Sequence, residues 1–251
     1  MHLRQGRGQV LVLAALTISL AILSTQAYVY QRSRARYSTD YSILSDYVLS
    51  IEQGSRHVVV ASLINVSGGG GASNLEGNLD RWEALVVGDY RFGRCDLNTT
   101  LASQLPYSDG VWLDWGTDGK GVSSAFADFT LNLSGRGVGV EWSFDVNAST
   151  VVLVSGYWEP THTNETLVTV IIDLLNDGEP ALASNVTVAY WRSNEWNDPS
   201  VLPSYSMLDY GNGTYRCSFI DVIPDTPIQV RVQASDRRGV FVQAEASLPE
   251  R

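Results

Sequence analysis

The hydrophobic positions of the chain fall into three successive patterns, of which the first is an unbroken apolar run. Val10 to Tyr30 contains no charged residue over 21 positions. A helix of that length measures roughly 31 Å, which matches the hydrocarbon core of a bilayer, so the run predicts a membrane anchor. Its densest part, Val10 to Leu23, is also the size of the core of a secretory signal, and Thr25 to Ala27 is a passable cleavage site. A cleaved signal therefore stays open as the alternative.

The second pattern is a helical period over residues 40–64. Apolar side chains recur there at spacings of three and four, which places them on one helical face. Gly54 interrupts this face, and a later run of four glycines ends the helix. Ser73 and Glu76 then form the pattern of a capping box, with the serine as the N-cap of a second helix. We expect a helical stalk or hairpin over residues 37–90.

The third pattern is strand-like alternation, which continues to the end of the chain. In Val138 to Val146 every second residue is apolar, so one face of a strand is apolar and the other is polar. Residues 159–164 are typical of a linker, and further strand-sized runs separated by turn residues follow them. We expect an antiparallel β region over 91–158 and a separate small β-sandwich over 159–251. With a signal or transmembrane anchor and its basic flanks at 1–36, the fold class is α+β.

Charge and composition narrow the compartment and the partners. The formal net charge of the 251-residue chain is −10, which argues against a nucleic-acid partner, because such proteins need a basic face. Asn-x-Ser/Thr sequons all follow the apolar run and favour a location outside the cytoplasm. These glycosylation candidates are Asn65, Asn98, Asn132, Asn147, Asn164, Asn185 and Asn212.

The two cysteines, Cys95 and Cys217, permit one disulfide outside the cytoplasm. Such a bridge would join the middle β region to the C-terminal part of the chain and would close a loop of roughly 120 residues. Buried thiols are the alternative.

Candidate chemistry is sparse. Asp109, Asp114 and Asp118 lie in one loop and form a weak calcium candidate, since calcium takes several oxygen ligands. Trp112 and Trp115 in the same loop are candidates for stacking on sugar rings. The histidines are scattered and no catalytic motif occurs, so we expect neither an enzyme nor a cofactor.

The residues Arg7, Gly8 and Gln9 directly before the apolar run resemble the class III signal of archaeal type IV pilin-like proteins. The resemblance implies processing between Gly8 and Gln9, with the apolar helix retained, and pilin-like subunits as partners. Leu13 stands where polymerising pilins usually carry a glutamate, so the resemblance implies anchoring and leaves filament assembly open.

A second resemblance concerns the last third of the chain. Asp209 to Tyr215 is similar to the Asp-x-Gly-x-Gly-x-Tyr turn of bacterial and archaeal immunoglobulin-like modules. It implies that the predicted C-terminal β-sandwich has an immunoglobulin-like fold.

These observations predict a single-pass, membrane-anchored, pilin-like surface protein that displays β modules outside the cell in a structural or interaction role. The alternative is an extracellular module that binds a solute or a glycan, with the loop from Asp109 to Lys120 as its site. A secreted enzyme is a weaker alternative.

Overall fold

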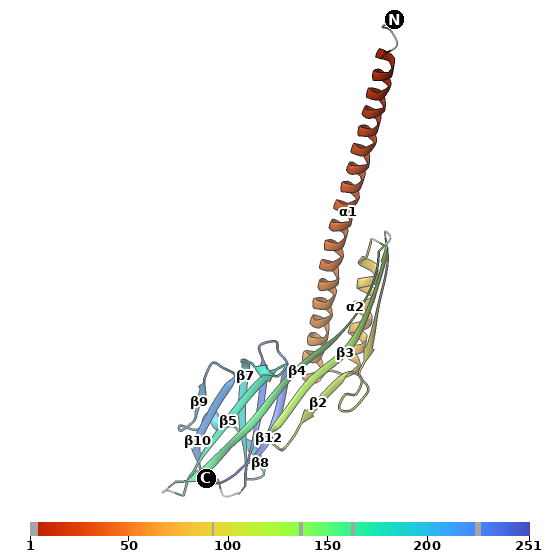
Figure 1. Ribbon diagram of the computed structural model, residues 1–251. Helices are drawn as coiled ribbons and strands as arrows, with labels where there is room; N and C mark the ends of the chain where they lie inside the picture. Colours follow the sequence, from red (N-terminus) through yellow and green to blue (C-terminus); the bar gives the residue numbers. More distant parts are fainter. Residues whose placement is uncertain (1–4, 92, 136–137, 162–163, 224–226) are drawn as a thin grey trace. The chain divides into compact units, whose positions relative to one another are not determined.

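Figure 1 shows the computed structural model of the chain, which describes residues 5–91, 93–135, 138–161, 164–223 and 227–251. The side chains of residues 5–18, 20–21, 31–43 and 138 lie outside that description. The described residues form helices and antiparallel strands, which confirms the α+β class. The chain divides into two units, Met1–Glu52 and Gln53–Arg251.

The first unit consists of one helix, the larger part of α1 (Gln5–Ser67). Among the described residues, no helical stretch combines the length and the apolar character that a membrane crossing requires. The predicted anchor at 1–36 has most of its side chains outside the described residues, and the predicted processing site at Gly8 and Gln9 lies in that part.

The second unit begins with the last turns of α1, which form a hairpin with α2 (Ser73–Asp89) (Figure 1). Two side-chain hydrogen bonds join the helices: Trp82 Nε1 donates to Ser55 Oγ over 2.9 Å, and Asn78 Nδ2 donates to Ser62 Oγ over 3.0 Å. The predicted helical hairpin is therefore confirmed for this part of the chain.

The structure also explains Gly54, which looked like an interruption of the helical pattern. A β-carbon added there would lie 2.3 Å from Cη2 of Trp82, so glycine makes room for the indole ring. The predicted capping box is wrong in detail. The N-cap is Ala72, without a side-chain hydrogen bond, and Ser73 is already the first helical residue.

Antiparallel strands build the rest of the second unit, in two sheets (Figure 1). The larger sheet has the order β1-β3-β4-β5-β10-β9, with β2 paired to β3 and β6 paired to β5. The smaller sheet has the order β12-β11-β7-β8. The strands of the larger sheet are β1 (Arg94–Leu101), β2 (Val111–Trp115), β3 (Lys120–Gly135), β4 (Val138–Pro160), β5 (Thr166–Asn176), β6 (Glu179–Pro180), β9 (Ser206–Asp209) and β10 (Thr214–Asp221). Those of the smaller sheet are β7 (Ala183–Arg192), β8 (Glu195–Asn197), β11 (Ile228–Asp236) and β12 (Phe241–Leu248), and a short 3-10 helix, η1 (Pro199–Val201), follows β8.

The long strand β4 joins the two β regions that the sequence analysis separates. Its residues up to Leu153 pair with β3, and its residues from Thr150 onward pair with β5. The expected boundary after residue 158 therefore falls inside a strand, and the expected linker is the connection between the paired strands β4 and β5.

The two sheets enclose one apolar core in the C-terminal half of the unit. Each strand contributes every second side chain, as in Val168, Val170 and Ile172 of β5, and all three are fully buried. Phe219 of β10 and Val232 of β11 meet in this core from opposite sheets. The result is a β-sandwich, as the sequence predicts for residues 159–251, but its first strand is the end of β4.

The turn between β2 and β3 lies against β12. Gly119 N donates to the carbonyl of Glu245, and Glu245 N donates to the carbonyl of Gly116, over 2.8 and 2.9 Å. Gly121 is packed so closely that a β-carbon would lie 1.9 Å from the carbonyl oxygen of Gln243. These contacts occupy backbone groups of β12, which as an edge strand would otherwise present them to other chains.

Candidate functional site

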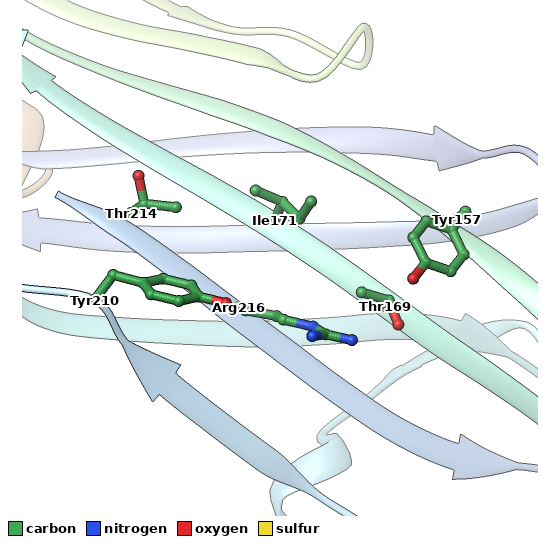
Figure 2. Close-up of a pocket in the computed structure, with 6 residues that line it drawn as sticks. All are labelled: Tyr157, Thr169, Ile171, Tyr210, Thr214 and Arg216. Atoms are coloured by element: carbon green, nitrogen blue, oxygen red, sulfur yellow. The ribbon is translucent and has the colours of Figure 1, made fainter. Parts of the chain in front are cut away.

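One hollow among the described residues is a pocket of about 370 Å³ on the larger sheet, away from the sandwich core (Figure 2). It spans three neighbouring strands, β4, β5 and β10, and the turn before β10. Its lining residues are Tyr157, Thr169, Ile171, Tyr210, Thr214 and Arg216.

Strand alternation explains why these side chains meet on one face. Thr169 and Ile171 alternate with the core residues of β5, and Arg216 lies between two core residues of β10. In the register of the sheet, Tyr157 lies opposite Thr169, and Ile171 lies opposite Arg216. Directly opposite residues have β-carbons about 5 Å apart, so the strands alone bring the side chains together.

Thr169 is the most unusual member of the pocket. Its side chain is buried, with 1% of the residue exposed, yet among the described residues no group forms a hydrogen bond with Oγ1. Leaving a buried hydroxyl without a partner costs about 1–3 kcal/mol. Such groups are rare in folded proteins and often mark a place where a water or a ligand supplies the missing bond.

Hydrogen-bond donors predominate around this hydroxyl. Arg216 is exposed and forms no ion pair within the described part of the chain. Tyr157 Oη accepts a hydrogen bond from Arg251 over 3.1 Å, which leaves its own O–H available to donate. Figure 2 shows the hydroxyls of Tyr157 and Thr169 and the guanidinium of Arg216 turned toward one another.

Two carboxylates near the pocket already have partners. Asp173 accepts a hydrogen bond from Thr214 Oγ1 over 2.7 Å, and Glu159 forms an ion pair with Arg251 over 3.1 Å. The guanidinium of Arg251 also lies over the ring of Tyr157, 4.7 Å from its centroid. The pocket can therefore offer donors and positive charge to an anionic ligand, with aromatic rings beside them.

The structure does not assemble the calcium candidate. Asp109 lies in the turn before β2, Asp114 lies on β2, and Asp118 lies in the turn after it. Within the described residues no three acidic, histidine or cysteine side chains gather as a metal site. Asp118 instead accepts a hydrogen bond from the backbone N of Lys120 over 3.3 Å.

The two tryptophans of this loop take part in packing. Trp115 donates from Nε1 to Ser123 Oγ over 3.1 Å, and its ring meets Phe241 edge-on at 5.2 Å. Trp112 meets Tyr107 edge-on at 6.1 Å. Neither residue lines the pocket on the larger sheet.

The cysteines do not form the candidate disulfide; both are buried thiols, which was the alternative. Cys95 lies on β1 and Cys217 on β10, with three strands between them in the sheet. Strands are spaced by about 4.8 Å, so roughly 19 Å separates two residues whose α-carbons must approach to within about 7 Å for a bridge. Burial raises the pKa of Cys217 to about 12, so its thiol stays protonated and unreactive in the native state.

The sequon asparagines all lie outside the core. Asn132 is partly buried and the other six are exposed. Asn147 Oδ1 accepts from Ser124 Oγ over 3.2 Å, and Asn212 Oδ1 accepts from the backbone N of Thr214 over 3.1 Å. Their accessibility is compatible with glycosylation, which stays a prediction.

Sequence reasoning missed the pocket because its residues are scattered along the chain between positions 157 and 216. The available signal was an arginine facing outward on a strand whose inward residues are Tyr215 and Cys217. Comparison with known proteins adds no family: no protein-family model matches the chain, and no curated protein matches it either.

Proposed function

We propose that this chain is a membrane-anchored surface protein with a structural or interaction role, in which the apolar run of residues 10–30 anchors a displayed β-rich unit. The observation that carries the proposal is the exposure of large apolar side chains on the first part of α1. Ile22, Leu23, Tyr28, Val29 and Tyr30 are 54%, 63%, 61%, 57% and 69% exposed.

A helix with apolar side chains all round is stable only where something apolar surrounds it, as a bilayer or other helices do. Moving one large apolar side chain from water into an apolar environment is favourable by about 1.5–3 kcal/mol. The five exposed side chains together therefore strongly favour a bilayer or a helix bundle around this part of α1. Tyr28 and Tyr30 are residues typical of the boundary between a membrane and water. A bilayer is the environment that the length of the run fits.

Two observations support an extracellular role for the second unit. The sequons are accessible, as attached glycans require. The sandwich also has the strand arrangement β4-β5-β10-β9 against β12-β11-β7. In chain order this is the arrangement A-B-E-D against G-F-C of the immunoglobulin fold, which many cell-surface domains use for display. We therefore assign the sandwich as immunoglobulin-like.

The resemblance of Arg7, Gly8 and Gln9 to a prepilin-type signal completes the proposal. The mature chain would begin at Gln9 and keep its apolar helix, and similar pilin-like subunits would be its partners in the membrane. Leucine at position 13 leaves open whether these subunits assemble into a filament.

Membrane fractionation with paired lysine substitutions tests the anchor. We expect Ile22→Lys with Leu23→Lys to move a large part of the protein from the membrane pellet to the soluble fraction, because each charge opposes insertion by up to about 3 kcal/mol. The matched control is Leu85→Lys with Val87→Lys, two exposed apolar residues of α2 that are 60% and 46% exposed. The control should stay in the pellet. Equal behaviour of the two double variants would contradict anchoring by this segment.

Intact-mass measurement of the native protein tests processing and compartment together. A start at Gln9 with added glycan mass on accessible sequons is the expected result. A start at Tyr28 would instead identify a cleaved signal and a secreted protein. Protease digestion of intact cells, which should remove the β-rich unit, tests its exposure at the surface.

A further inference from the structure

We propose that the pocket formed by Tyr157, Thr169 and Arg216 binds a carboxylated sugar, such as a hexuronate residue of an acidic glycan. The site is independent of the display role, because it depends only on side chains of the second unit. It would give the displayed sandwich a ligand.

The charge of the ligand follows from Arg216. Arg216 offers a planar set of N–H donors that no carboxylate of the described chain occupies. Paired donors of this kind match a carboxylate, which accepts two parallel hydrogen bonds. The chain has a net charge of −10, so acidic partners for an arginine are plentiful. An accessible arginine that pairs with none of those in the described chain does not stabilise the fold through an ion pair and is available to bind an anionic ligand.

A second polar group of the pocket is the buried hydroxyl. Thr169 lies between Tyr157 on β4 and the strand of Arg216, is 1% exposed and has no partner for Oγ1 among the described residues. This oxygen has almost no exposed surface, so a ligand reaches it only when a neighbouring side chain moves aside, and the new hydrogen bond would then remove the cost of an unsatisfied polar group. Since a hydroxyl both donates and accepts, it suits a sugar hydroxyl or a second carboxylate oxygen.

The walls of the pocket fit a sugar ring in shape and chemistry. The rings of Tyr157 and Tyr210 and the side chain of Ile171 give the hollow flat and apolar surfaces, which fit the C–H faces of a pyranose ring. The phenol of Tyr210 is also accessible, since the residue is 53% exposed. An anion without a ring would leave these walls unused.

The pairing of the strands excludes recognition of a peptide by strand addition. At the pocket β5 lies between β4 and β10, and β10 lies between β5 and β9, so the backbone groups of both strands are engaged in the sheet. The open side of β4 is covered as well: Trp158 N donates to the carbonyl of Pro249 over 3.0 Å, and Arg251 N donates to the carbonyl of Trp158 over 3.0 Å. Only side chains remain available, and they are hydroxyls, a guanidinium and rings.

The test is a titration of the full chain in lipid nanodiscs, followed by NMR of the isotope-labelled protein. Methyl β-D-glucuronide and methyl α-D-galacturonide are the probes, methyl β-D-glucoside is the same kind of ring without the carboxylate, and acetate is the carboxylate without the ring. We expect the uronides to shift the amide signals of residues 157, 169 and 216. The glucoside and acetate should each bind at least tenfold more weakly.

Three variants locate the binding. Arg216→Gln should weaken uronide binding at least tenfold, and Thr169→Val should weaken it severalfold without lowering the melting temperature. Arg237→Gln, at an exposed arginine outside the pocket that also forms no ion pair among the described residues, should change nothing.

Each contrary result overturns a defined part of the proposal. No binding of either uronide, or unchanged binding by Arg216→Gln, overturns the site. If acetate binds as tightly as the uronides, the site recognises an anion and not a sugar ring. If the glucoside binds as tightly as the uronides, the site does not recognise the carboxylate. None of these results bears on membrane fractionation, so this proposal and the anchor can fail separately.

Discussion

The two ends of helix α1 both carry large apolar residues but have opposite surroundings. In the first unit, Leu23 is 63% exposed, and its apolar neighbours from Ile22 to Tyr30 are exposed too. In the second unit, Leu63 and Val59 are fully buried, and the intervening polar positions include Ser55 and Ser62, which bond to α2. One end is packed by its own chain, whereas the large apolar side chains of the other end are exposed.

The two ends differ both in the number of their apolar residues and in the way these are arranged around the helix, and the arrangement determines what can cover each end. The end that packs within its own unit is amphipathic and carries small residues where α2 approaches. The other end is apolar on every side, which fits an environment outside the chain.

The largest expected effect comes from truncating one leucine at each end. Leu63→Ala should lower the free energy of unfolding of the second unit by about 2–5 kcal/mol, because it leaves a cavity in a packed interface. Leu23→Ala should change it by less than about 0.5 kcal/mol, as exposed substitutions do. Denaturant unfolding of the full chain in detergent micelles, followed by tryptophan fluorescence, measures both. Similar losses would mean that the first end is also packed within the chain.

Two helical glycines provide the next pair. Gly54→Ala should destabilise by about 1–2 kcal/mol, because overpacking against Trp82 outweighs the gain of about 1 kcal/mol in helix propensity. Gly77→Ala of α2, where a β-carbon would meet nothing within 4 Å, should stabilise by about 0.5–1 kcal/mol. If Gly54→Ala is instead the stabilising one, the indole does not occupy the space above residue 54.

The hydrogen bond between the helices should have a smaller effect. A double-mutant cycle of Ser55→Ala and Trp82→Phe should give a coupling energy of roughly 1 kcal/mol, since both variants remove the same bond from a partly buried site. A matched cycle of Ser55→Ala with Leu85→Ala, an exposed residue of α2, should give none. Additive effects in the first cycle would show that the bond contributes nothing to the hairpin.

The smallest expected effect distinguishes the structure from the sequence pattern. A capping serine at position 73 would cost about 1 kcal/mol on replacement by alanine. Because Ser73 lies within the helix and makes no capping bond, Ser73→Ala should change the stability by less than about 0.5 kcal/mol. A decrease of about 1 kcal/mol in the free energy of unfolding, measured in urea, would show that Ser73 is the N-cap after all.

Much of the local structure follows from the sequence. The spacing of apolar residues predicts the hairpin helices, and the alternation in residues 138–146 predicts the strand that became part of β4. The same alternation did not reveal how the strand is covered. Trp142 is 46% exposed although it lies on the apolar face, because this part of β4 pairs with β3 alone and forms an edge of the sheet.

The expected domain boundary and the candidate disulfide both depend on contacts between residues far apart in the sequence, and the structure shows neither. The strands β4 and β5 continue one sheet across the expected linker, and the cysteines that a single pairing would join lie on strands that are not neighbours. A pattern of turn residues around position 160 is the same whether the next strand pairs with the previous one or starts a new domain. Whether a new domain begins there depends on which strands pair, and strand pairing depends on contacts between residues that a short sequence window does not contain.

The α+β class, the helical hairpin, most strands and the apolar run can be predicted from the sequence alone, because each of these depends on a local period that matches a helix or a strand. The continuous sheet through β4, the separate buried thiols and the pocket around Thr169 become visible only in the folded chain. Each of these requires residues from strands far apart in the chain to meet, and strand register, which local propensity leaves undetermined, fixes which of them do.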